Sequence, residues 1–138
     1  MIQRIQTVYL GVSMLLSFLL YYFPFYRVGL DGALIVSASE HLYLLPTAAL
    51  VIVMHVAVIF MFNNRKRQAQ FALWLMILLL IYLACGVAAV SQEVQNGIQI
   101  SGFRLGAVIP VISLILVWLA RYNILKDDAL VKSMDRLR

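Results

Sequence analysis

Charged residues are scarce in this chain, which excludes an ordinary water-soluble core. Only 12% of its 138 residues are charged and 64% are hydrophobic, whereas soluble domains average roughly 25% charged and 45–50% apolar residues. A chain of this length forms one domain and buries only about two-thirds of its surface. Much of the apolar surface must therefore face lipid.

Cysteine is almost absent, and recognisable catalytic motifs are lacking. The single cysteine, Cys85, excludes an internal disulfide and a zinc cluster built from several cysteines. The sequence contains no nucleophile elbow, Walker loop, dinucleotide fingerprint or paired carboxylates. We therefore expect a protein that is not an enzyme and has no cofactor or metal; an intramembrane enzyme is kept as a minor alternative.

Four long apolar runs are present instead, at about residues 5–25, 42–62, 71–90 and 105–122. About 20 helical residues cross the ~30 Å hydrocarbon layer of a bilayer. Barrel strands would be about ten residues long and would alternate in polarity. The first run is too long for a signal-peptide core, and no small-residue cleavage site follows it promptly. The pattern predicts one all-α integral membrane domain, a four-helix transmembrane bundle, followed by a tail at residues 123–138.

The eleven basic residues set the expected orientation. Nine lie before the first run, between the second and third, or from Arg121 at the end of the fourth run onward, and only Arg27 and Arg104 lie in the other two connections. Lysine and arginine are enriched in cytoplasmic loops, so we expect both ends of the chain in the cytoplasm. The net charge of +5 comes from the ends of apolar runs, not from one basic face, and predicts no nucleic-acid partner.

The two connections on the outer side contain strand-like segments. Asp31-Gly32 lies between β-prone residues, which is a strong hairpin signal, and residues 98–103 have the composition of another short strand. A third strand helps to stabilise a lone hairpin. We expect a small extracytoplasmic sheet that caps the outer ends of the helices; two irregular loops are the alternative, which the sequence leaves open.

His55 lies near the middle of the second run, where an ionisable residue suggests a functional site. A proton relay or metal site needs further ionisable groups, and the interiors of the runs contain no acidic or basic residue. We favour a neutral imidazole that hydrogen-bonds a neighbouring helix, as polar residues in membrane helices commonly do. The candidate partners are Ser13, Ser17, Tyr82 and Ser113.

The segment after the fourth run predicts a C-terminal cytoplasmic amphipathic helix. Leu130, Met134 and Leu137 share one face, and Asp128 and Lys132 form an i,i+4 pair. Such a helix suits a solvated tail or an anionic lipid surface, and equally a cytoplasmic partner. The candidate partner-contact residues on this side of the membrane are Gln3, Arg4, Arg65, Lys66, Arg67, Asp127, Asp128, Lys132, Asp135, Arg136 and Arg138.

Three segments resemble the domain-of-unknown-function family 4293. They are residues 1–10 (MIQRIQTVYL), residues 64–68 (NRKRQ) and the closing residues 126–138 (KDDALVKSMDRLR). That family consists of small four-helix membrane proteins of Bacteroidetes-type bacteria. The resemblance extends over essentially the whole chain and implies four spans in the bacterial inner membrane, but it implies no activity.

The function favoured by these features is a small non-enzymatic subunit or accessory factor of a larger inner-membrane complex. Its expected partners are the lipid bilayer, other inner-membrane proteins and a cytoplasmic partner at the C-terminal helix. A small oligomeric transporter or channel is the alternative. Four short spans rarely enclose a pathway alone, and His55, the serines and Tyr82 are the only visible polar lining.

Overall fold

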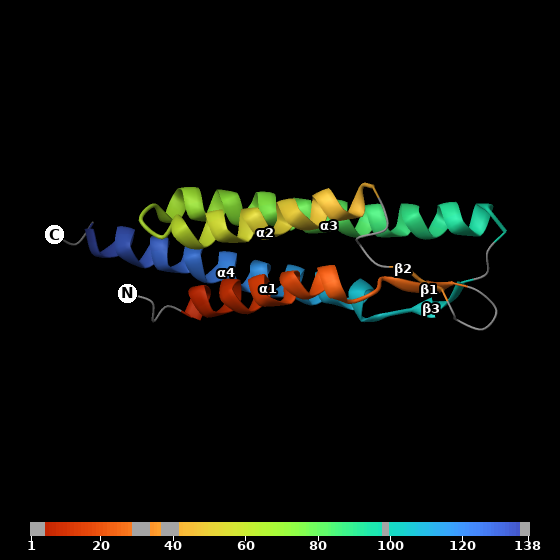
Figure 1. The fold of residues 1–138 in the computed structure, drawn as a ribbon. Helices are drawn as coiled ribbons and strands as arrows, with labels where there is room; N and C mark the ends of the chain where they lie inside the picture. The colour runs from red at the N-terminus through yellow and green to blue at the C-terminus, as the bar shows by residue number, and fades with distance from the viewer. Residues whose placement is uncertain (1–4, 29–33, 37–41, 98–99, 136–138) are drawn as a thin grey trace.

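A computed structural model describes residues 5–28, 34–36, 42–97 and 100–135 of the chain. It contains four helices that run alongside one another: α1 (Ile5–Tyr22), α2 (Leu44–Phe60), α3 (Arg65–Gln95) and α4 (Leu105–Asp135) (Figure 1). α1 and α3 each pack against both α2 and α4, which closes the bundle. The start of α1, the α2–α3 turn and the end of α4 lie together (Figure 1). We call this the basic end.

Three of the helices are long and apolar enough to cross a membrane. These segments are Leu44–Asn63, Arg65–Gln95 and Leu105–Ser133. Only 28% of the apolar window in the first two, and 33% in the third, is buried within the bundle, so most of this apolar surface faces outward. The apolar helix at Ile5–Leu20 is shorter, and a fourth span at α1 stays a prediction.

Two helices extend beyond the predicted apolar runs. α3 continues to Gln95, past the run that ends at residue 90, and α4 continues without a break to Asp135. No glycine or proline follows Pro110 within α4, so nothing in the sequence interrupts the helix after the apolar run. The predicted C-terminal amphipathic helix is thus the last part of α4 and not a separate element.

Three short antiparallel strands lie at the opposite end from the basic end. β1 (Tyr26–Val28) pairs with both β2 (Leu34–Val36) and β3 (Ile100–Phe103), in the order β2-β1-β3. The predicted turn at Asp31-Gly32 falls outside the described residues. The strands extend beyond the ends of α1 and α4, in line with these two helices (Figure 1).

The strand signals near residues 26–36 and 100–103 thus correspond to a small sheet, but a cap over the outer ends of the helices is not supported. Two backbone hydrogen bonds join the segments from which the strands extend. The amide of Arg104 donates to the carbonyl of Phe25 (3.1 Å), and the amide of Gly106 donates to that of Pro24 (3.1 Å). These bonds tie the chain leaving α1 to the chain that begins α4, and the strands extend from this junction in line with the two helices (Figure 1).

Phe25 connects this end of the bundle to α3. Its side chain is buried, and its ring meets Tyr82 edge to face at a centroid distance of 6.2 Å. A Cβ atom at Gly86 would lie 2.2 Å from Phe25 Cζ, closer than atoms can approach. The absence of a side chain at Gly86 therefore makes the space that the Phe25 ring fills.

Candidate functional site

The first candidate site is a polar cluster inside the bundle, centred on His55. His55 from α2, Ser13 and Ser17 from α1, and Ser113 from α4 are each fully buried. Ser13 Oγ lies 2.8 Å from His55 Nε2, and His55 Nδ1 lies 2.9 Å from the carbonyl oxygen of Val51. The cluster thus joins α1, α2 and α4.

The hydrogen-bond partners define the form of the His55 ring. A carbonyl oxygen can only accept, so Nδ1 carries a proton and donates to Val51. In a neutral imidazole Nε2 then accepts, and the Ser13 hydroxyl donates to it. The same hydroxyl lies 3.3 Å from the carbonyl oxygen of Ser113, which is a weaker, secondary contact because a hydroxyl has one proton. A neutral ring is therefore fully hydrogen-bonded here.

The remaining serines complete the cluster without adding a reactive group. Ser17 Oγ donates to the carbonyl of Ser13 on its own helix (2.9 Å). Ser113 Oγ is buried and has no hydrogen-bond partner among the described residues. Tyr82, another candidate partner of His55, packs on Phe25 instead. Of the four predicted partners, Ser13 is the one whose side chain bonds the imidazole.

The surroundings of His55 limit its chemistry. The described part of the chain contains no group of three or more His, Cys, Asp or Glu side chains able to hold a metal ion. The acidic residues of the described helices belong to the last third of α3 or α4, far along the chain from the cluster: Glu93, Asp127, Asp128 and Asp135. What the geometry provides is a hydrogen-bonded connection between helices.

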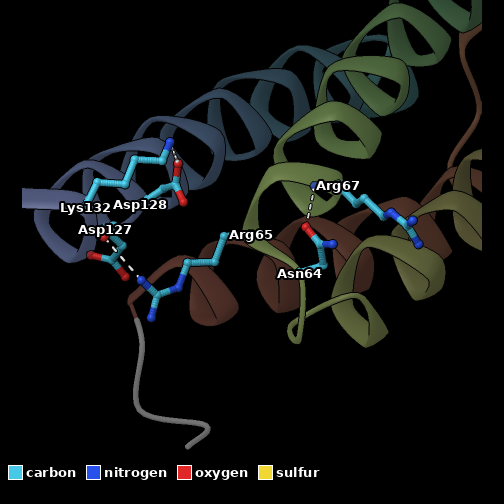
Figure 2. A network of polar contacts seen from close by, with 6 residues as sticks. All are labelled: Asn64, Arg65, Arg67, Asp127, Asp128 and Lys132. Carbon is cyan, nitrogen blue, oxygen red and sulfur yellow. Dashed lines mark hydrogen bonds and ion pairs between the residues drawn. The ribbon is translucent and has the colours of Figure 1, made fainter. Parts of the chain in front are cut away.

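The second candidate site is the basic end, where α3 begins and α4 ends. Arg65 Nη1 donates to the backbone carbonyl of Asp127 at 3.2 Å (Figure 2). Arg121 Nε donates to the carbonyl of Ala69 at 3.3 Å. Arg65 thus bonds from α3 to α4, and Arg121 bonds from α4 to α3, so both side chains hold the two helices together.

The α2–α3 turn is organised by side chains that sequence reasoning missed. Asn64 caps α3, its side-chain oxygen accepting from the backbone amide of Arg67 at 3.2 Å. The buried Gln68 donates to the carbonyl of Val58 on α2 at 3.1 Å. Asparagine directly before a helix is a recognised start signal, so the role of Asn64 was readable from the sequence. No local pattern announces the long-range contact of Gln68.

Asp128 and Lys132 form the predicted ion pair on the last turns of α4, beyond its apolar part (Figure 2). The hydrogen bond from Lys132 lowers the pKa of the Asp128 carboxyl, and the positive charges of Lys66 and Arg65 act in the same direction. The pair itself is exposed, and exposed pairs contribute little to stability.

The structure brings together only some of the predicted contact residues. Arg65, Lys66, Asp127, Asp128 and Lys132 gather where α3 meets α4. Arg67 points away from this group (Figure 2). Asp135 lies in α4, but its side chain is outside the described parts, as are four whole residues: Gln3, Arg4, Arg136 and Arg138.

Comparison with known families agrees with the resemblance of the sequence segments. The model of the family described as "Domain of unknown function (DUF4293)" matches residues 2–137, nearly the whole chain. The chain belongs to the DUF4293 family. No curated protein and no solved structure matches it. For this DUF4293 chain the argument for a function therefore rests on the two sites described above.

Proposed function

We propose that this DUF4293 chain is a non-enzymatic protein of the bacterial inner membrane that serves as a small subunit or accessory factor of a larger membrane complex. The observation that carries the proposal is the contrast between the two candidate sites. In the interior, the side chains of His55 and Ser13 are hydrogen-bonded to each other. At the basic end, the cations Lys66 and Lys126 are exposed. Exposed positive charge on a surface suits the binding of a partner protein better than it suits catalysis.

The membrane placement rests on four spans with both chain ends in the cytoplasm. Three helices have the necessary length and apolarity. α1 has 18 residues, which gives about 27 Å at the usual rise, close to the ~30 Å hydrocarbon thickness. An even number of spans brings the two chain ends to one side, and the excess of lysine and arginine there favours the cytoplasm.

The docking surface that we propose is the exposed part of the basic end. Arg65 and Arg121 are engaged with backbone carbonyls of neighbouring helices, so their loss would disturb the fold as well as any interaction. Lys66 and Lys126 are exposed on neighbouring parts of α3 and α4, and they are the better probes. A partner with an acidic cytoplasmic face would complement them.

The test is affinity purification of the tagged full chain from native membranes after mild crosslinking. The parent should recover a defined inner-membrane partner. Lys66→Glu with Lys126→Glu should lower its recovery about tenfold, because like charges across an interface are strongly unfavourable. The matched control, Arg27→Glu with Arg104→Glu, changes the same charge on the opposite side and should recover the partner normally.

A topology control accompanies these variants, since charge reversal can alter insertion. A reporter fused after Arg138 should remain cytoplasmic in the double variant. A parent chain that purifies alone under crosslinking contradicts the proposal. So does equal loss of the partner in the double variant and its control.

A small oligomeric transporter or channel is the second candidate, and the buried titratable ring of His55 is the observation in its favour. Flux through liposomes that contain the parent should then exceed flux with His55→Ala. Equal flux for every ion tested excludes this candidate, because no other described side chain within the bundle interior carries a titratable imidazole.

A further inference from the structure

An open apolar groove runs between α2 and α3 on the outside of the bundle. Its volume is about 340 Å³. Both helices belong to segments able to span a membrane, so the medium around the groove is lipid. The lining comes from α2 (Leu50 and Met54) and from α3 (Trp74, Ile77, Leu78 and Ile81).

A positively charged side chain lies on the same face of α3 as the groove. Arg67 precedes Trp74 by seven residues and Leu78 by eleven, spacings that return to one helix face. The backbone amide of Arg67 bonds the Asn64 cap. Its guanidinium is exposed, has no partner in the part of the chain that the structure describes, and points away from the Asp127 group (Figure 2).

The spacing between the groove and Arg67 corresponds to half a bilayer. Eleven residues from Arg67 to Leu78 span about 16 Å along a helix. The arginine side chain leans further toward the helix start, as side chains on helices do. Leu78 lies near the middle of α3, and the headgroup region begins about 15 Å from the bilayer centre and ends some 20–22 Å from it. Arg67 therefore lies at headgroup depth when the groove lies at acyl-chain depth.

We propose that this groove binds one anionic phospholipid, with an acyl chain against Trp74 and Leu78 and the phosphate on Arg67. Arginine presents a planar fork of donors that matches a phosphate group. A second copy of the chain fits the surface less well. A two-fold contact through the groove would bring two Arg67 side chains to the same depth, and like charges repel. The lipid site is independent of the docking function proposed above.

Tryptophan fluorescence offers a direct test, because the groove contains one of the two tryptophans of the chain. Trp74 is 59% exposed on the groove, and Trp118 is 53% exposed on α4, away from it. The full chain carrying Trp118→Phe reports from Trp74, and the full chain carrying Trp74→Phe is the matched control. Each is placed in vesicles of phosphatidylglycerol and phosphatidylcholine in which either lipid carries brominated chains, which quench tryptophan on contact.

The expected result is a preference of Trp74 for phosphatidylglycerol of about fivefold, the ratio that one basic residue near an anionic lipid provides. Arg67→Gln should reduce the ratio of quenching of Trp74 by the two lipids to about one. Lys126→Gln, which removes a charge from α4, should leave this ratio unchanged. Trp118 should show a preference close to one throughout. These results together support the site.

Three results overturn the proposal. Trp74 in the parent background could be quenched equally by both lipids, which would show that the groove is filled without selection. The preference could persist in Arg67→Gln, which would remove the proposed phosphate contact. Trp74 could also be quenched less than Trp118 at every lipid composition, which would show that a second copy covers the groove.

Discussion

Ser13 on α1 and His55 on α2 are joined by a hydrogen bond of 2.8 Å between Oγ and Nε2, with both side chains fully buried. The bond holds two helices together at a depth where water is excluded. It also satisfies the one ring nitrogen of His55 that its own helix cannot reach. The role of His55 in this fold is thus first a matter of helix association.

Replacing Ser13 by alanine should destabilise the bundle by about 1 kcal/mol. Hydrogen bonds between membrane helices contribute roughly 0.6 kcal/mol on average and up to about 1.7 kcal/mol, and this change leaves Nε2 of His55 without its donor. Reversible unfolding in mixed micelles measures the difference. Ser17→Ala is the control, because Ser17 bonds only a carbonyl of its own helix, and an equal loss there would argue against a special role for Ser13.

Adding a methyl group at Gly86 should cost more than adding one at Gly11. Alanine at Gly86 would collide with the Phe25 ring, whereas nothing lies within 4 Å of a Cβ atom at Gly11. Forcing extra volume into a packed core typically costs about 1–3 kcal/mol. Thermal unfolding in detergent should show the loss for Gly86→Ala alone. The double variant Gly86→Ala with Phe25→Leu should recover part of it; no recovery would mean that the strain lies elsewhere.

Arg65→Gln should loosen the contact between the first turn of α3 and the last turns of α4. The bond to the Asp127 carbonyl is partly buried and 3.2 Å long, and such bonds contribute about 1 kcal/mol. Hydrogen exchange should therefore speed up several-fold in residues 124–132. Lys66→Gln is the neighbouring control and should leave exchange there unchanged, since no hydrogen bond of the Lys66 side chain fastens the two helices within the described region.

Acid should loosen the end of α4 through Asp128. The pKa of Asp128 is lowered in the folded chain, chiefly by the hydrogen bond from Lys132. Because the pKa is lowered by folding, the stability contributed by the Asp128 carboxylate is complete above its ordinary pKa of 3.8. This contribution disappears as the pH falls through the pKa of Asp128 in the folded chain. Exchange protection of residues 128–132 should be lower in acid, below the ordinary value of 3.8, than at pH 7. Asp128→Asn should show no such pH dependence from this pair, and an identical drop in that variant would refute the assignment.

Several features of the candidate sites were predictable because they depend on local sequence. The Asp128–Lys132 pair follows from i,i+4 spacing on a helix, and the structure contains it. A hydrogen bond from His55 to a neighbouring helix, with Ser13, Ser17, Tyr82 and Ser113 as candidate partners, followed from its depth in an apolar run. The choice of Ser13 over Ser17 or Ser113 could not be predicted, because it depends on how α1 and α2 are rotated about their axes when they pack.

The sheet and the groove illustrate what local patterns could not provide. Short strand signals were readable near residues 26–36 and 98–103. The bonds from Arg104 to Phe25 and from Gly106 to Pro24 were not, because they join the end of α1 to the start of α4, and α2 and α3 lie between these segments in the sequence. The groove forms only where the surfaces of α2 and α3 meet. The sequence of α2 or of α3 alone therefore does not predict the groove.

The sequence by itself determined the apolar helices, the family and the concentration of positive charge at one end, because length, composition and charge are properties of neighbouring residues. Only the tertiary structure decided that Arg65 fastens α3 to α4 while Arg67 stays exposed, that Phe25 fills the space above Gly86, and that Ser13 meets His55. These contacts join residues far apart in the chain. Close packing of whole helices selects them, and no single segment encodes that packing.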